Sequence, residues 1–316
     1  MDRRILLKSA ASSAVSLGLL AGGTPKANGA HGGARPAGSA ATQARTGGFI
    51  ETPDRVRIAY SDWGSGPAIV FIHAWALPSP MWDYQIAALS HQGLRCVAYD
   101  RRGHGRSDKP GSGYDCDTLA DDLSALLTQL DLNDVTLVSH SFGSAEVVRY
   151  LTRHGAGKIK RIVMIAPAAL PFVMKTQDNP GGIPQAQLEF FRTKVLQADF
   201  PRWLEEGKQA FFAADISPGL QDWIKELMLT TPLPVAIESN RQVTSTDFRK
   251  ELPGVSVPTL IIHGDKDASA PINFNGRPTA AMIPKANLKV YEGAAHGLFL
   301  THKDRLNEDI AAFVKA

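Results

Sequence analysis

Cysteine is scarce in this sequence, and no apolar run is long enough to cross a membrane. Only Cys96 and Cys116 occur among the 316 residues, which excludes a scaffold held together by several disulfides. Cys96 lies within the apolar run LRCVAY, where a small buried side chain is the ordinary case, so we expect two free thiols. The apolar stretch near the N-terminus is shorter than the roughly 20 residues that span a bilayer, so stable membrane insertion is not expected.

The sequence also lacks a basic cluster that would suit nucleic acid. Its net charge is +3, but six Lys and Arg residues against Asp2 alone give residues 1–46 a charge of +5. The remaining residues therefore carry −2, and they contain no Lys/Arg cluster interleaved with aromatic residues. With 44% hydrophobic and 21% charged residues, the composition is that of an ordinary globular protein. Nucleic-acid binding is therefore not expected.

Neither a metal motif nor a cofactor motif is complete. No His/Cys/Glu set has the spacing of a metal site, so we expect no metal. The segment Asp100–Asp108 (DRRGHGRSD) follows an apolar run and contains a GxG, but Ser107-Asp108 stands where a dinucleotide fingerprint needs its third glycine. We therefore predict a structural turn beneath the site and no bound cofactor.

Residues 1–46 have the pattern of an export leader followed by a linker. The start MDRRILLK resembles the twin-arginine signal, which directs folded bacterial proteins to export, and a disordered tail with chance arginines is the alternative. Small residues allow cleavage near Ala27-Asn28-Gly29 or near Ser39-Ala40-Ala41. The Gly/Ala-rich stretch from 22 to 48 is expected to lack structure. We therefore predict a periplasmic or secreted protein.

Short apolar runs rich in β-branched residues alternate with helical patterns along the rest of the chain. The runs span residues 68–73, 94–100, 135–140, 159–167, 258–264 and 287–293. Such runs indicate buried parallel strands, and their alternation with helices predicts an α/β protein with a mostly parallel, doubly wound sheet. The stretch 48–64 predicts an antiparallel hairpin at one edge of that sheet.

The alternation stops after Pro167. From residue 171 to 250 the chain carries helix-like segments interrupted by prolines, and no internal repeat is visible. We predict that this segment is a helical cap, inserted into a sheet domain made of residues 47–170 and 251–316.

A nucleophile elbow is predicted at Ser141. The apolar run VTLV leads into Ser139-His140-Ser141-Phe142-Gly143 and then into a helical pattern, a context in which the central serine is exposed on a tight turn. Small residues are needed two positions either side of that serine, and Ser139 takes the place of the usual first glycine. A helix N-cap serine in an ordinary βα turn is the alternative.

A general base and an orienting acid are expected after later strands, in the order Ser, Asp, His. His296 follows the run LKVYE, and Asp267 and Asp265 both follow the run PTLII. We favour Asp267 as the acid, because Asp265 comes directly after Gly264, where a turn-capping carboxylate is common. His302 is the rival base, but its place at the start of the last helix favours a solvated residue.

Two backbone N–H groups are expected to bind the oxyanion of the reaction intermediate. The fold takes one from the residue after the nucleophile, here Phe142, and one from a loop after an early strand, here Trp75. A purely structural role in the core is the alternative for the Trp75 side chain.

Five segments resemble the non-haem chloroperoxidase and arylesterase group of the α/β-hydrolase superfamily. They are FIHAWALPSPMWDYQ, YDRRGHGRSDKP, SHSFGSAEVVRYL, PTLIIHGDKDASAP and VYEGAAHGLFLTHKDRLNEDIAAF. The resemblance implies an α/β-hydrolase fold, a cofactor-free Ser141, Asp267 and His296 triad, and oxyanion donors at Trp75 and Phe142. It also implies hydrolysis of small esters, lactones or amides, and in several members perhydrolysis of short carboxylic acids. Ala74 and Ser139 depart from the family by replacing glycines.

The leading interpretation is therefore a carboxylic ester hydrolase that acts on a small molecule. Perhydrolysis, which makes peracids from short carboxylic acids and peroxide, is the second enzymatic hypothesis, and a non-catalytic ligand receptor on the same fold is the third. A haloalkane dehalogenase or epoxide hydrolase would need aspartate in place of Ser141. Apolar candidates for the substrate pocket are Leu170, Phe172, Phe211 and Leu298, and Trp75, Phe142 and Phe212 are further candidates. The sequence does not indicate an oligomeric state.

Overall fold

The computed structural model describes residues 47–213 and 216–316. The export leader predicted over residues 1–46 lies outside the described residues. In the described part, no helix is both long enough and apolar enough to cross a membrane. Both thiols are buried and free, as predicted for Cys96 and Cys116.

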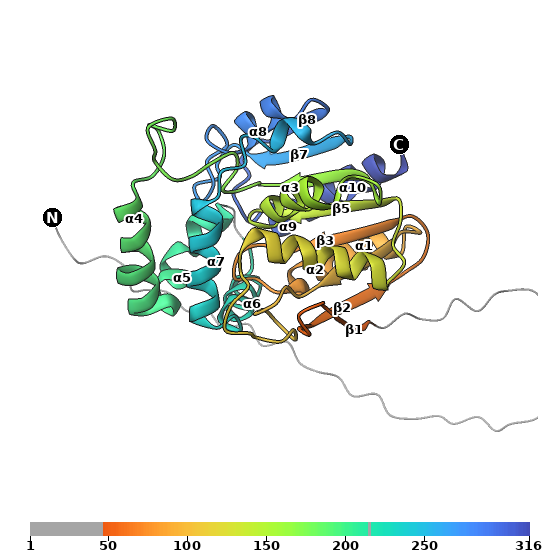
Figure 1. Cartoon of the computed structure of the whole chain (residues 1–316), viewed down its shortest axis with the longest axis horizontal. Helices are drawn as coiled ribbons and strands as arrows, with labels where there is room; N and C mark the ends of the chain where they lie inside the picture. The colour runs from red at the N-terminus through yellow and green to blue at the C-terminus, as the bar shows by residue number, and fades with distance from the viewer. Residues whose placement is uncertain (1–46, 214–215) are drawn as a thin grey trace, which may run out of the picture. The chain divides into compact units, whose positions relative to one another are not determined.

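An eight-stranded, mostly parallel sheet forms the centre of the molecule (Figure 1), as the apolar runs predicted. Its spatial order is β1-β2-β4-β3-β5-β6-β7-β8, and every pair from β4 to β8 is parallel. The six parallel strands are β3 (Ala68–Ile72), β4 (Arg95–Tyr99), β5 (Val135–His140), β6 (Ile159–Ile165), β7 (Thr259–Gly264) and β8 (Ala286–Tyr291). Every residue of β5 and β7 is buried, which explains why these strands are mainly apolar and do not alternate regularly between apolar and polar residues.

The predicted hairpin forms the antiparallel edge of the sheet. It consists of β1 (Gly48–Glu51) and β2 (Arg57–Trp63), which pair antiparallel to each other. Strand β2 then pairs antiparallel with β4 and joins the hairpin to the parallel strands.

Helices cover both faces of the sheet, so it is doubly wound. Alternate residues of β3 show this, because Ile69 and Phe71 belong to one hydrophobic cluster and Val70 and Ile72 to the other. The first cluster includes residues of α1 (Asp83–Ser90) and α10 (Lys303–Lys315), and the second includes residues of α2 (Cys116–Gln129) and α3 (Gly143–His154). Shorter helices complete the core: η1 (Ser79–Trp82), η3 (Leu252–Gly254), α8 (Gly276–Met282) and α9 (Leu298–Thr301).

The segment between β6 and β7 is helical and lies beyond one end of the sheet (Figure 1). It contains α4 (Gln185–Phe190), the π-helix η2 (Phe191–Leu196), α5 (Gln197–Phe212), α6 (Pro218–Leu229) and α7 (Leu233–Ser245). Buried residues of α5, α6 and α7 belong to the first hydrophobic cluster, so the inserted helices share a core with one face of the sheet.

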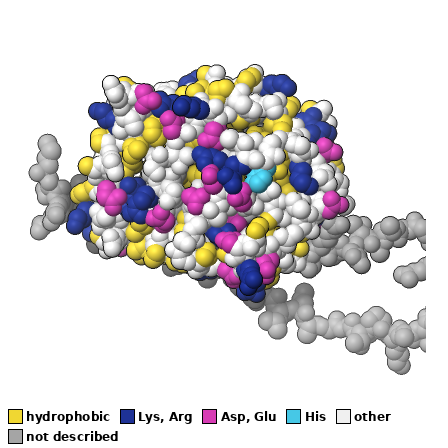
Figure 2. Space-filling model, viewed as in Figure 1, with side chains coloured by type: hydrophobic (Ala, Val, Ile, Leu, Met, Phe, Trp, Pro, Cys, Tyr) yellow, Lys and Arg dark blue, Asp and Glu magenta, His cyan; other side chains and the backbone are white. Residues whose placement is uncertain are grey.

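One proline marks a break in the inserted helices. The chain runs from α4 through η2 into α5, but Asp199 within α5 leaves helical geometry with φ −161° and ψ 78°, so two helices meet there at a kink. Pro201 follows two residues later, near the start of the second helix, as the sequence suggested. On the face shown in Figure 2, Lys and Arg side chains are interspersed with Asp and Glu.

Candidate active site

Ser141 lies on a sharp turn between β5 and α3. Its φ of +54° is in the left-handed region, which non-glycine residues rarely adopt, and its N–H donates to the Ile165 carbonyl at 2.9 Å. Helix α3 begins two residues later at Gly143, where a Cβ atom would lie 2.8 Å from the Ile72 carbonyl oxygen. The sequence therefore needs glycine at 143 so that the helix can pass close to β3.

Ser139 is accommodated in place of the usual glycine by a partner on the same turn. Its side chain is fully buried, and its Oγ lies 3.1 Å from the Oγ of Ser144 in the first turn of α3. The two hydroxyls satisfy each other in a place that water does not reach. The extra side chain thus joins the end of β5 to the start of α3.

The structure brings Ser141, His296 and Asp267 together in one hydrogen-bonded chain. The Ser141 Oγ lies 2.9 Å from His296 Nε2, and His296 Nδ1 lies 2.7 Å from Asp267 Oδ2. The three residues are 6%, 6% and 5% exposed. Because a carboxylate only accepts hydrogen bonds, Nδ1 carries the proton and Nε2 presents its lone pair to the serine hydroxyl.

Asp267 is held as an anion. Burial opposes its ionisation, but the electrostatic interaction with His296 and hydrogen bonds from His263, His296 and the Ala270 N–H outweigh it, so its pKa lies well below the ordinary value. The Ala270 N–H donates to Asp267 Oδ1 at 2.7 Å. A stable negative charge thus faces the imidazole.

The rival residues lie elsewhere. Asp265 is exposed and accepts the Gly293 N–H at 2.7 Å, so it links its loop to the loop that precedes His296 and does not cap its own turn as predicted. His302 stands at the start of α10, where its Nδ1 lies 2.8 Å from Thr301 Oγ1 and burial lowers its pKa. Neither residue contacts Ser141.

The backbone N–H groups of Trp75 and Phe142 have no hydrogen-bond acceptor in the described part of the chain. Phe142 is the N-cap residue of α3, so its N–H also lies at the positive end of the helix dipole. Two free donors on the loops that flank Ser141 are what an oxyanion would require.

A buried arginine that the sequence analysis did not single out supports both loops. The Arg101 guanidinium donates to the carbonyls of His73 and Ala74, which precede Trp75 in its loop. Its Cζ also lies 4.7 Å from the centroid of the Phe142 ring. One cation therefore contacts the two segments that carry the free donors.

Glu146 in the first turn of α3 neutralises this cation. Both Arg101 and Glu146 are 1% exposed and pair through Arg101 Nε, and the Tyr99 hydroxyl also donates to Glu146. Burial raises the pKa of Glu146, while the charge of Arg101 lowers it. The Asp100–Asp108 segment is thus a structural turn beneath the site, as predicted: its first carboxylate accepts the N–H groups of Ser79 and Arg106.

The inserted helices contact the site at two points. The Trp75 indole Nε1 donates to the Ala236 carbonyl at the start of α7 at 2.7 Å. The Gly297 N–H, next to His296, donates to the Phe211 carbonyl at the end of α5, also at 2.7 Å. A Cβ atom at Gly297 would lie 2.7 Å from the Phe212 ring, so glycine permits this approach.

The predicted pocket residues divide into two groups. The Phe211 ring centroid lies 5.5 Å from that of His296, and Leu298 is fully buried in the same hydrophobic cluster. Leu170 belongs to the cluster on the other face of the sheet, and the Phe172 ring packs under Arg249, 5.1 Å from its guanidinium carbon. Of these four residues, Phe211 is the one that packs against a member of the triad.

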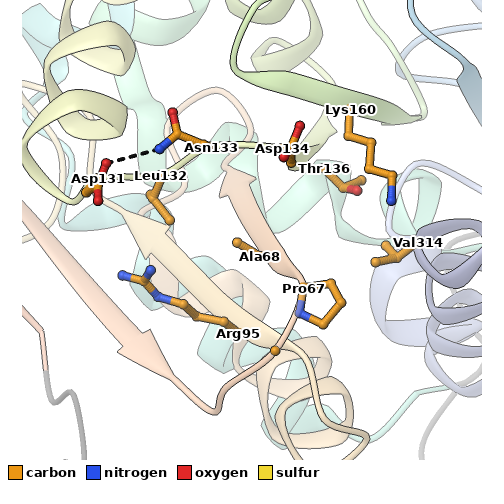
Figure 3. A pocket seen from close by; sticks show the side chains of 11 residues that line it. Pro67, Ala68, Arg95, Asp131, Leu132, Asn133, Asp134, Thr136, Lys160 and Val314 are labelled. Atoms are coloured by element: carbon orange, nitrogen blue, oxygen red, sulfur yellow. Dashed lines mark hydrogen bonds between the residues drawn. The ribbon is translucent and has the colours of Figure 1, made fainter.

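A separate pocket of about 350 Å³ lies at the other end of the parallel strands (Figure 3). It is lined by Ala68 and Arg95, which begin β3 and β4, and by the Asp131–Asp134 loop before β5. The triad follows the carboxyl ends of β5, β7 and β8, where open α/β sheets bind substrates, so this pocket is not part of the candidate site. Among the described residues, no three His, Cys, Asp or Glu side chains are grouped to hold a metal ion.

Comparison with known proteins defines the class. The family model for the alpha/beta hydrolase fold matches residues 67–303, and the chain belongs to this family. The chain is 39% identical to the non-heme chloroperoxidase CPO-A1 of Kitasatospora aureofaciens, over 83% of this chain and 98% of that protein. It is 32% identical to the bifunctional esterase/perhydrolase DCH of Acinetobacter calcoaceticus, over 85% and 100%.

Solved structures give the same result. An esterase from Exiguobacterium antarcticum superposes with a TM-score of 0.81 at 31% identity, covering 85% of this chain and all of that one. Within the α/β-hydrolase family, the chain is thus related to the proteins named non-heme chloroperoxidases and to esterases, as its motifs indicated.

Proposed function

We propose that this protein is a serine hydrolase of small carboxylic esters, with lactones and amides as related acyl substrates. The observation that carries the proposal is the hydrogen-bonded chain from Ser141 through His296 to Asp267. Its support from relatives is the esterase named in the comparisons.

In the proposed reaction, Ser141 Oγ attacks the ester carbonyl carbon while His296 Nε2 takes the hydroxyl proton. The Trp75 and Phe142 N–H groups bind the oxyanion, and Asp267 stabilises the imidazolium. The intermediate then expels the alcohol, which receives the proton from His296, and an acyl group remains on Ser141. Water, activated by the same imidazole, attacks this acyl-enzyme and releases the acid.

The substrate is expected to be uncharged near the reacting carbon. The side chains that we assign to the site around Ser141 are Trp75, Phe142, Phe211 and Leu298, none of which is charged. The Arg101 guanidinium is fully engaged with carbonyls and Glu146, so it is not free to bind an anion.

A panel of esters, lactones and amides that vary in acyl length tests the proposal. The variants Ser141→Ala and His296→Ala should each lose about 10⁴-fold in kcat/KM, roughly 5 kcal/mol of transition-state stabilisation. The matched control is His302→Ala, which removes a histidine outside the chain of hydrogen bonds and should keep most of the activity. An organophosphate should label Ser141, as mass spectrometry can show.

A folded wild-type protein that is neither labelled nor active on any member of the panel would refute the proposal and favour a ligand receptor. Full activity in folded Ser141→Ala would refute the mechanism.

Perhydrolysis is a second proposal, favoured by the relative named esterase/perhydrolase and by those named chloroperoxidases. A short carboxylic acid would acylate Ser141 with loss of water, and hydrogen peroxide would attack the acyl-enzyme in place of water. The products are a peracid and free enzyme. The peracid then oxidises bromide in solution to hypobromous acid and returns the carboxylic acid.

The test is bromination of an organic acceptor, with peroxide and bromide, in the presence and absence of acetate. We expect bromination to require acetate, to disappear in Ser141→Ala together with ester hydrolysis, and to be unaffected by chelators. Bromination without any carboxylate, or in Ser141→Ala, would contradict the shared acyl-enzyme.

Export through a twin-arginine signal is the third proposal, and it concerns residues outside the described part. The support is the start MDRRILLK. Tagged full-length protein should accumulate outside the bacterial cytoplasm without its first 29 to 46 residues. Replacing Arg3-Arg4 by Lys-Lys should retain it inside, and unchanged export of that variant would exclude this route.

A further inference from the structure

His263 is a fully buried polar residue, the second-to-last of strand β7, before the loop that carries Asp267. Its Nε2 lies 2.8 Å from the carbonyl oxygen of Ala270 and 3.2 Å from Asp267 Oδ2. Because a carbonyl oxygen only accepts, Nε2 carries the proton. One N–H of His263 therefore faces both a loop carbonyl and the carboxylate of the triad.

The same loop residue closes a ring of contacts around this carboxylate. Ala270 accepts from His263 through its carbonyl and donates to Asp267 Oδ1 through its N–H at 2.7 Å. Asp267 Oδ2 lies between His263 Nε2 at 3.2 Å and His296 Nδ1 at 2.7 Å. Both oxygens of Asp267 are thus held by contacts other than the one with His296.

The His263 ring is closely packed against the backbone of α8. A Cβ atom at Gly276, the first residue of α8, would lie 2.5 Å from His263 Nδ1. The Nδ1 atom itself is buried without a hydrogen-bond partner in the described part of the chain. A ring that leaves one nitrogen unsatisfied is costly in a buried strand, so the contacts of the other nitrogen must offset this cost.

We propose that His263 is a positioning residue, which holds Asp267 and its loop in the geometry that orients His296. The inference rests on the proposed serine hydrolase function. The His263 side chain has no contact with Ser141, so its effect on the reaction must pass through Asp267. Loss of its N–H would let the 267–270 turn shift and would change where the carboxylate meets the imidazole.

Two substitutions of similar length separate the N–H from the bulk of the side chain. His263→Gln retains an N–H donor near the position of Nε2, and His263→Met places a methyl group there. We expect His263→Met to lower kcat by about tenfold to a hundredfold, the range for loss of a hydrogen bond to a charged group, with KM unchanged. His263→Gln should recover most of the loss.

A double-mutant cycle with Asp267→Asn distinguishes positioning from general support of the fold. If His263 acts through Asp267, His263→Met should reduce kcat much less in the Asp267→Asn background than in the wild type. A merely structural role would give the same fold-loss in both backgrounds. Unfolding temperatures of all variants establish that each is folded at the assay temperature.

The rate of Ser141 phosphonylation by an organophosphate provides a readout that needs no ester substrate. Wild-type protein that is labelled but hydrolyses no ester would refute the proposed function and still permit the cycle. Equal rates for His263→Met and wild type, equal losses for the Met and Gln variants, or additive losses with Asp267→Asn would each overturn the role of His263.

Discussion

Replacing Asp267 by Asn should abolish nearly all ester hydrolysis, whereas the same change at Asp265 should be almost silent. The Asp267 carboxylate accepts the Nδ1–H of His296 at 2.7 Å in a buried site. An amide NH₂ group in that position would favour the other tautomer, in which Nε2 carries the proton and cannot accept one from Ser141. Substitution of the orienting acid in other triads costs about 10⁴-fold, which corresponds to about 5 kcal/mol.

The Asp265 change removes far less. Its carboxylate is exposed and accepts one N–H, from Gly293, at 2.7 Å, and the carbonyl oxygen of Asn can accept the same bond. We expect at most about 1 kcal/mol in unfolding free energy and less than about a threefold change in kcat/KM. The measurement is kcat/KM with one ester for both purified variants, with circular dichroism as the control for folding. A larger loss at Asp265 than at Asp267 would show that the acid is wrongly assigned.

Two further substitutions test how the site is held. Gly143→Ala would place a Cβ atom 2.8 Å from the Ile72 carbonyl oxygen, so we expect it to cost about 1 to 3 kcal/mol in stability and to lower kcat/KM at least about tenfold. Trp75→Phe removes the indole hydrogen bond to Ala236, and denaturant titration should show a loss of about 1 kcal/mol. Unchanged stability in either variant would contradict the corresponding contact.

The sheet could be predicted from the sequence because its central parallel strands are buried. Burial on both faces favours mainly apolar strands, and β5 and β7 are buried at every residue. Ser141 could be predicted for a related reason, since the strand, the turn and the helix are adjacent in the sequence. Asp267 was preferred over Asp265 because a carboxylate directly after a glycine commonly caps its own turn, although Asp265 instead accepts the Gly293 N–H of another loop.

The break between two of the inserted helices was predictable because a proline marks it: the chain leaves helical geometry at Asp199, two residues before Pro201. Pocket residues were predicted from apolar character alone. This property does not distinguish Phe211, beside His296, from Phe172, which packs under Arg249.

Arg101 shows why part of the site is invisible to local patterns. Its partners are Glu146, 45 residues away, and the carbonyls of His73 and Ala74, 28 and 27 residues away. A charged residue directly after a buried strand has the same appearance whether it is exposed or forms a buried pair. Only the fold shows that Glu146, in the first turn of α3, supplies the opposite charge.

Three buried histidines share a role that their positions in the sequence partly reveal. His73 directly follows β3, and His140 and His263 lie at the carboxyl ends of β5 and β7. Each is fully buried and has a ring nitrogen bonded to a backbone carbonyl of a site loop: that of Ala74, His296 or Ala270.

Burial keeps the His140 and His73 rings neutral, since it lowers the pKa of His140 to about 3 and that of His73 well below its usual value. A neutral imidazole offers one donor at the end of a rigid side chain without a buried charge. A histidine at the carboxyl end of a mainly apolar strand is therefore suited to hold a loop at that end of the sheet. By this reasoning, polar residues that end buried strands are candidates for positioning roles even when they do not react.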